Sequence, residues 1–281
     1  MKNKFFGFIL SNIFLLNIAF SQTETSTRLP QAGNLSFGIN AVPILLWMGN
    51  TLNGNVNNNA IQDEKFFNNV GPLVTLRYVS DPSTFFRMTY LGGRNISEKQ
   101  NLVWNNAMPN DPDNLVTDKM IRTDNFWGLG VGIEKRKSNG NLQGYFGTDL
   151  FYTRNNSKTE FQYGNGHSIS NQSPTSTYDF DNRLSRSANT RTIKTSEGTD
   201  NTVAIRAFVG AEYFFAKGMS LGVEYGLSFA YSRQKEGFIQ TETFNAATNS
   251  IMTGVQRTGS KSQYSDGLDN QGGAISLNFY F

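Results

Sequence analysis

The 281-residue chain contains no cysteine, only seven prolines and a single histidine. Without cysteine it has no disulfide framework and no site for a lipid anchor on a cysteine. After the first twenty residues there is no apolar run of the roughly 20 residues that a transmembrane helix requires. Basic and acidic residues nearly balance, at 25 against 22, so the pI near 9.0 does not indicate nucleic-acid binding.

The N-terminal residues have the features of an export signal. Two lysines lie within residues 1–4, residues 5–20 are mostly apolar, and the small residues Ala19 and Ser21 follow. This order is typical of a secretory signal peptide. We therefore expect residues 1–21 to be a signal peptide cleaved after Ser21, and residues 22–281 to form the mature domain. A retained membrane helix is the alternative, but the apolar run is short for a span.

Short segments of alternating hydrophobicity recur along the rest of the chain. In the clearest one, bulky Trp127, Leu129, Val131 and Ile133 alternate with three glycines. The eight alternating segments lie at 34–47, 74–78, 86–90, 127–133, 142–152, 203–215, 221–231 and 275–281. Short turns follow the second, fourth and sixth segments, whereas long polar connections occupy 48–69, 97–123, 155–202 and 234–271. Alternation of this kind predicts β-strands that expose one apolar face.

An even number of strands, joined by short turns on one side and long loops on the other, is typical of bacterial outer-membrane barrels. We predict an all-β fold: an eight-stranded antiparallel up-and-down transmembrane β-barrel with short periplasmic turns and long extracellular loops. A soluble sandwich or lipocalin-like barrel is the alternative. It is disfavoured because the glycines and polar residues would then face water while the bulky residues filled the interior of every strand.

The last segment ends in alternating apolar residues and a final aromatic: Leu277, Phe279 and Phe281. It resembles the C-terminal strand by which outer-membrane barrels are recognised for assembly. In strand count and loop asymmetry, the mature chain resembles the small OmpA/OmpX-type barrels, including their PorT-like members. This architectural resemblance implies a porin-like fold in the cell outer membrane of a Gram-negative bacterium. It also implies contact with the barrel assembly machinery, outer-membrane lipid and lipopolysaccharide.

The alternation also predicts which charged side chains point into the barrel. The inward set is Arg77, Arg87, Glu134, Asp149, Arg206, Glu212 and Glu224. Charges of opposite sign enclosed in a narrow interior must pair. If each strand faces the fourth strand along, Arg77 pairs with Glu212 and Arg87 with Glu224. A structural plug is favoured over a gated proton or ion path, because side chains fill an eight-stranded interior.

Few residues suggest chemistry. His167, with Ser168 and Ser170, invites comparison with barrel enzymes that act on lipids, but no acid is placed to orient the ring and an exposed loop histidine is favoured. Four aspartates in and directly after the second connection lack the glycine turn and terminal glutamate of a calcium loop: Asp111, Asp113, Asp118 and Asp124. We therefore predict no catalytic, metal or cofactor site.

Function is expected to reside in the long loops, above all 155–202 and 234–271, because loops on a rigid scaffold carry function. We expect a non-enzymatic barrel with a structural, adhesion or interaction role that binds a protein partner or a surface. Residual strand character at 153–163 and 190–194 predicts that the third hairpin projects as an exposed sheet. The alternatives are an accessory subunit of an outer-membrane secretion or uptake complex, and a lipid-modifying enzyme that uses His167.

Overall fold

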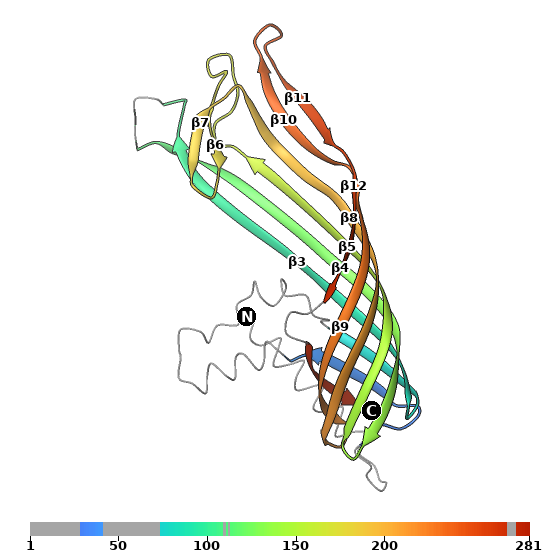
Figure 1. The fold of residues 1–281 in the computed structure, drawn as a ribbon. Coiled ribbons are helices and arrows are strands. Elements are labelled where there is room, and N and C mark those ends of the chain that lie inside the picture. Colours follow the sequence, from blue (N-terminus) through green and yellow to red (C-terminus); the bar gives the residue numbers. More distant parts are fainter. Residues whose placement is uncertain (1–28, 42–73, 109–110, 112, 269–273) are drawn as a thin grey trace.

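The computed structural model describes residues 29–41, 74–108, 111, 113–268 and 274–281. These residues form an all-β structure of thirteen strands (Figure 1). The strands are β1 (Leu35–Asn40), β2 (Val74–Asp81), β3 (Thr84–Trp104), β4 (Leu115–Asn139), β5 (Leu142–Gln162), β6 (Thr175–Asp179), β7 (Leu184–Ser187), β8 (Thr190–Ala216), β9 (Met219–Gln234), β10 (Gly237–Asn245), β11 (Ser250–Thr258), β12 (Lys261–Leu268) and β13 (Ala274–Tyr280). A helix of sufficient length and apolarity to cross a membrane does not occur in these described ranges.

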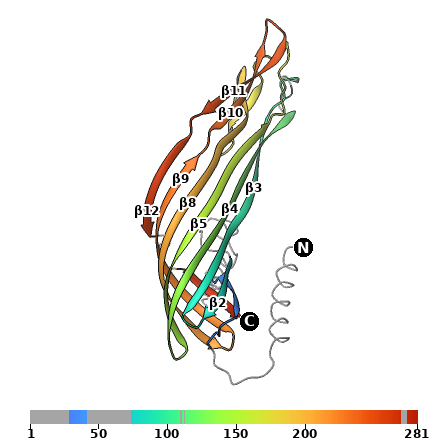
Figure 2. The ribbon, with the colours of Figure 1, turned by 90° about the vertical axis from the view of Figure 1, so that its right-hand side faces the viewer.

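Eleven of the strands form one antiparallel sheet that is closed over part of its length. The pairings run β1–β2–β3–β4–β5–β8–β9–β13 and return to β1, where Phe37 lies opposite Phe279. We call this closed part the ring. Beyond it the long strands continue as an open sheet, in which Figure 2 shows the strands side by side from β12 to β3. We call this open part the extension.

The extension corrects the predicted strand count, because the sheet has eleven strands where eight were expected. Much of the three connections 97–123, 155–202 and 234–271, predicted as loops, is strand. β3 continues to Trp104 and β4 begins at Leu115, while β10 pairs with the far half of β8 and β12 with the far half of β9. Both faces of these segments carry polar residues, so no apolar alternation marks them. The first predicted connection, 48–69, lies outside the described residues.

The three predicted short turns join β2 to β3, β4 to β5 and β8 to β9, all at one end of the ring. Two of them contain a glycine with positive φ, Gly140 at 58° and Gly218 at 70°. This backbone conformation favours glycine, which has no Cβ to clash. In the first turn, the Asp81 carboxylate accepts a hydrogen bond from the Ser83 backbone N–H at 2.8 Å.

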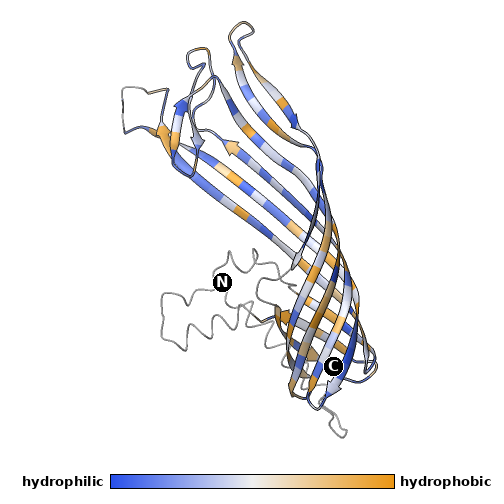
Figure 3. Cartoon of the chain, viewed as in Figure 1, coloured by the Kyte–Doolittle hydropathy of each residue, from blue (hydrophilic) through white to orange (hydrophobic). Residues whose placement is uncertain are grey.

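Along the ring strands, exposed and buried residues alternate. On β9 the bulky residues from Leu221 to Tyr231 are exposed, whereas Ser220, Gly222 and Glu224 are buried. The same alternation on β3, β4, β5 and β8 gives the ring a bulky apolar outer face and a small or charged interior, visible as alternating colours in Figure 3. The sequence-based assignment of faces is therefore observed in the structure.

The short-turn end of the ring is closed by a compact apolar cluster. Val79, Phe85, Phe214 and Tyr280 are buried, and Leu29 packs against them. Tyr280 contacts Phe214 at 5.4 Å and Phe85 at 6.4 Å between ring centroids. All four come from inward positions on four different strands. Their packing fills this end of the ring.

Candidate functional site: a charge network inside the ring

Among the residues that the structure describes, four arginines and four carboxylates lie inside the ring, and each is at most 8% exposed. They are Arg77, Arg87, Arg136 and Arg206 together with Glu134, Asp149, Glu212 and Glu224. Inward-facing positions on six strands, β2, β3, β4, β5, β8 and β9, supply them. Four positive and four negative charges give a net charge of zero. The interior therefore satisfies the requirement that buried charges be compensated.

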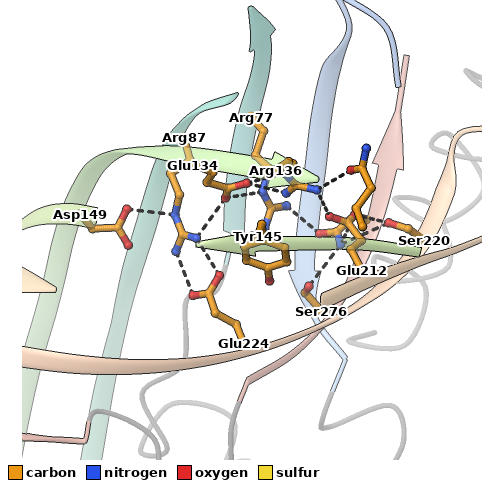
Figure 4. Close-up of polar contacts among 12 residues, drawn as sticks. Arg77, Arg87, Glu134, Arg136, Tyr145, Asp149, Glu212, Ser220, Glu224 and Ser276 are labelled. Carbon is orange, nitrogen blue, oxygen red and sulfur yellow. Dashed lines mark hydrogen bonds and ion pairs between the residues drawn. The ribbon is translucent and has the colours of Figure 1, made fainter. Parts of the chain in front are cut away.

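Glu134 is the centre of the network. Its Oε1 accepts hydrogen bonds from Arg77 Nε at 3.0 Å and Arg87 Nη1 at 3.1 Å. Its Oε2 accepts another from Arg136 Nε at 2.8 Å. Figure 4 shows these side chains converging from different strands on the one carboxylate. One anion thus holds β2, β3 and β4 together from the inside.

A second group of contacts lies on one side of Arg87. Its guanidinium binds both oxygens of Glu224, at 2.7 and 3.2 Å, in the bidentate geometry that strengthens such pairs. Arg87 Nε lies 3.0 Å from Asp149 Oδ1, an ion pair without hydrogen-bond geometry. Arg206 Nη1 joins Asp149 at 3.3 Å and Glu224 at 2.6 Å. These contacts connect β3, β5, β8 and β9 across the ring.

A third group ties the last strand into the network. Glu212 accepts hydrogen bonds from Arg136 Nη1 at 2.5 Å, Asn278 Nδ2 at 2.9 Å and Tyr280 Oη at 2.9 Å, and a further one from Ser220 Oγ. Asn278 also accepts from Arg77 Nη1 at 2.9 Å. Because Asn278 and Tyr280 belong to β13, this group fastens the strand that closes the ring.

Aromatic rings occupy the space between the charges. The guanidinium of Arg87 lies 4.1 Å from the centroid of Phe208, and that of Arg136 lies 4.1 Å from Phe85 and 4.6 Å from Tyr145. Stacking on a ring face stabilises a desolvated cation. A Cβ at Gly210 would overlap the Tyr145 ring, so this interior glycine provides the space that the ring fills.

The seven charged residues predicted to face inward all lie in this network. The predicted ion pair between Arg87 and Glu224 is present, but Arg77 binds Glu134 and Asn278 instead of Glu212. Arg136, the residue that binds Glu212, was missed. It is flanked by two exposed lysines next to a turn, so the sequence around it is typical of a solvated segment. It lies two residues after Glu134 on the same strand, and this spacing could have identified it as an inward-facing residue. The pairing of Arg77 was predicted wrongly because the strands of a closed sheet are tilted and staggered. Two residues on strands that face each other across the ring can therefore lie at different heights along its axis.

Phe85 and Phe86 are neighbours at the short-turn end of β3 but lie on opposite faces. Phe86 is exposed, whereas the side chain of Phe85 is fully buried in the interior cluster. Leu277 and Phe279 of the predicted assembly signal are half-buried on β13, and Phe281 is exposed. The predicted cleavage site at Ser21 lies outside the described residues.

Above the ring, Asp118 organises one face of the extension. It is fully buried and accepts hydrogen bonds from the backbone N–H of Gly164 at 2.8 Å and of Thr177 at 2.7 Å, and from Thr177 Oγ1 at 2.9 Å. These contacts dock the β6–β7 hairpin against the β3–β4 part of the sheet (Figure 1). Asp118 is thus a structural acceptor, and within the described ranges no group of residues could hold a metal ion.

His167 lies in the connection between β5 and β6. Its ring stacks on Phe244 at 6.4 Å, and its Nδ1 lies 3.2 Å from the carbonyl oxygen of Gln172. Partial burial, and then the charge of Arg191, lower the pKa of His167 below its ordinary value. Ser168 Oγ is hydrogen-bonded to Ser170 Oγ. In the described part of the chain no carboxylate forms an ion pair or hydrogen bond with His167.

Comparison of the chain with protein-family models and with curated proteins finds no match.

Proposed function

We propose that the ring spans the outer membrane as a β-barrel and presents the extension outside the cell. The supporting observation is the height of the apolar outer face. On β5 the outward apolar residues run from Leu142 to Tyr152, and the next outward residue is Arg154. Ten residues extend about 33 Å along a strand, or about 25 Å along the membrane normal at a tilt of about 40°. This equals the apolar band of membrane barrels.

β9 repeats these limits independently, with outward apolar residues from Leu221 to Tyr231 followed by Arg233. Exposed side chains in this band include Phe229 at 57% and Phe146 at 62%. A continuous exposed face of this size would cause aggregation in water. In a bilayer it faces hydrocarbon, which favours insertion.

We further propose that the barrel acts by binding and not by transport or catalysis. Within the described residues, the charge network and the aromatic cluster occupy the interior of the ring, which supports a filled lumen and not an aqueous channel of the kind that porins have. β3 continues for fourteen residues beyond Tyr90 to Trp104, about 45 Å at about 3.3 Å per residue. There Leu102, Trp104 and Leu115 are 61%, 68% and 42% exposed. An apolar patch at the far end of a polar sheet is typical of a protein-binding surface.

The proposal leaves His167 without a lipid-modifying role. The outward apolar face of β5 ends at Tyr152, whereas β5 itself continues to Gln162 before the connection that carries His167. Ten strand residues place this histidine on the order of 30 Å along the strand from hydrocarbon. A catalytic histidine also needs a partner to orient its ring, and its Nδ1 contacts only a backbone carbonyl.

Tryptophan quenching tests membrane insertion. Trp127 lies at the margin of the apolar band and Trp104 in the extension, so the two act as a matched pair. In W47F/W104F, which keeps Trp127, we expect strong quenching by brominated lipid and weak quenching by aqueous iodide. In W47F/W127F, which keeps Trp104, we expect the reverse. Similar quenching of both residues by brominated lipid would contradict the proposal.

Site-specific photocrosslinking in intact cells tests the binding role. A photoreactive residue in place of Trp104 is expected to give discrete adducts with another protein. The same residue in place of Gln100, which lies on the same outward face, is expected to give few. Adducts lost when Leu102 and Leu115 are both changed to serine would support the apolar patch as the contact. Equal adducts at both positions would argue against it.

A further inference from the structure

Three exposed arginines follow the apolar band on three strands of the ring. Arg154 is the first outward residue after Tyr152, and Arg233 is the first after Tyr231. Arg94 is the first charged outward residue after Tyr90, with Gly92 between them. Each arginine thus lies just above a tyrosine at the outer margin of the band. We call this set the arginine rim.

Sheet register places the rim residues side by side. Arg154 lies opposite Asn201, and Asn201 opposite Arg233, so these two arginines share a row. One strand, β8, lies between them, so the two arginines are two strand spacings, or about 10 Å, apart. Arg94 lies two residues above Gly92, which shares the row of Trp127 and Arg154. Arg94 and Arg154 are therefore two strand spacings apart across the sheet and two residues apart along the strands. The distance between them is about 12 Å.

On the described strands β3, β4, β5, β8 and β9, the outward positions at the height of the rim carry hydrogen-bond donors and no acid. The other outward positions of the rim carry Asn125, Asn156 and Asn201. In the part of the chain that the structure describes, no ion pair or hydrogen bond engages the side chains of the three arginines. The nearest outward carboxylates on β3 and β5 belong to Glu98, 3.6 Å from Lys119, and Glu160, 2.6 Å from Lys158. On β12, Asp266 lies opposite Phe229, four residues below Arg233 in the register.

We propose that the arginine rim binds the phosphate groups of anionic lipids in the outer leaflet. This inference rests on the proposed membrane position of the ring. At the height of the aromatic margin, an outward side chain meets lipid headgroups. A guanidinium can bind a phosphate in bidentate fashion, which a lysine cannot do. The spacing of about 10–12 Å lets adjacent arginines bind separate phosphates, on one lipid or on two neighbours.

The opposite margin provides a matched control. Among the described residues, the outward basic residues of this margin are lysines: Lys135 and Lys137 near the end of β4, and Lys217 in the turn between β8 and β9. A variant with these three lysines changed to glutamine removes the same charge as R94Q/R154Q/R233Q. It leaves the arginine geometry intact. The pair therefore separates phosphate recognition by the rim from a general effect of net charge.

The test is lipid selectivity measured with spin-labelled lipids on the full chain reconstituted in phosphatidylcholine vesicles. The wild type is expected to prefer spin-labelled phosphatidic acid over spin-labelled phosphatidylcholine. One arginine near a lipid surface contributes about fivefold in affinity, so R94Q/R154Q/R233Q should lose at least about fivefold of this preference. The lysine variant should keep most of it. Wild-type selectivity in the arginine variant, or an equal loss in the lysine variant, would overturn the inference.

Two further measurements separate the causes of failure. Competition with inorganic phosphate, against chloride at matched ionic strength, should not abolish the lipid preference. If phosphate alone abolishes it, the rim binds a free anion and the lipid assignment is wrong. All samples of this test carry W47F/W104F, so that quenching of Trp127 by brominated lipid is recorded on the same samples. Loss of selectivity with Trp127 still quenched tests the rim, whereas absence of quenching in the wild type contradicts the membrane proposal itself.

Discussion

Replacement of Glu134 by glutamine is the sharpest perturbation of the interior, because it removes one charge and almost no volume. The carboxylate is fully buried and accepts hydrogen bonds from Arg77, Arg87 and Arg136 at 3.0, 3.1 and 2.8 Å. With glutamine, four arginines would face three carboxylates. Removing one partner of a buried ion pair costs about 3–5 kcal/mol. We expect E134Q to lower the free energy of unfolding by that amount.

Equilibrium unfolding in urea, followed by Trp127 fluorescence in lipid vesicles with all variants made in the W47F/W104F background, gives the free energy. Glu160→Gln is the matched control, since Glu160 lies in the extension with its side chain 45% exposed and binds Lys158 at 2.6 Å. Its loss should cost less than about 1 kcal/mol. The double variant E134Q/R136Q removes one charge of each sign and should recover part of the stability. Substitutions of exposed residues normally change the free energy of unfolding by less than about 0.5 kcal/mol. If the change for E134Q is no larger than this, the network does not stabilise the ring.

Two other predictions concern the interior and the extension. In planar bilayers the purified barrel should show no large, steady conductance. The variant R87A/E224A removes one positive and one negative side chain from the interior and should conduct more. Steady currents through the wild type would contradict the filled interior. The pKa of His167 is lowered by burial and by Arg191, with Glu242 opposing, so its neutral form is favoured in the folded state. The stability that His167 contributes is therefore present above its ordinary pKa and is lost as the pH falls through the lowered one. The protection of the amides in residues 166–173 against hydrogen exchange, corrected for the intrinsic exchange rate, should fall as the pH is lowered through the range in which His167 becomes protonated. His167→Phe should remove this dependence, and an unchanged pH dependence in that variant would show that another group is responsible.

The sequence was sufficient to predict which side chains lie on the outer face of the ring and which lie on the inner face. Trp127, Leu129, Val131 and Ile133 are exposed, and the intervening Gly128 and Gly130 are buried. A strand has a side-chain period of two, so a contrast between bulky and small residues identifies the faces without knowledge of the neighbours. The short turns could also be predicted from the sequence, because the positive φ at positions 140 and 218 restricts them largely to glycine.

The extension could not be predicted in this way. Residues 154–162 of β5 carry polar side chains on their outer face, such as Arg154, Lys158 and Glu160, and polar Ser157 and Thr159 on the inner one. Without contrast between faces, alternation carries no signal. These strands form because β4 and β8 on either side pair their backbone groups with those of β5. The docking role of Asp118 was hidden for the same reason, since its partners Gly164 and Thr177 come from the following connections.

By itself, the sequence determined the faces of the ring strands, the short turns and the set of seven charged residues that is enclosed. Each of these depends on neighbours along the chain, within one strand or one turn. Only the tertiary structure decided which arginine binds which carboxylate, how far β3, β4, β5 and β8 extend, and where β10 and β12 attach. Those features depend on the stagger between strands and on backbone pairing, which join residues far apart in the sequence.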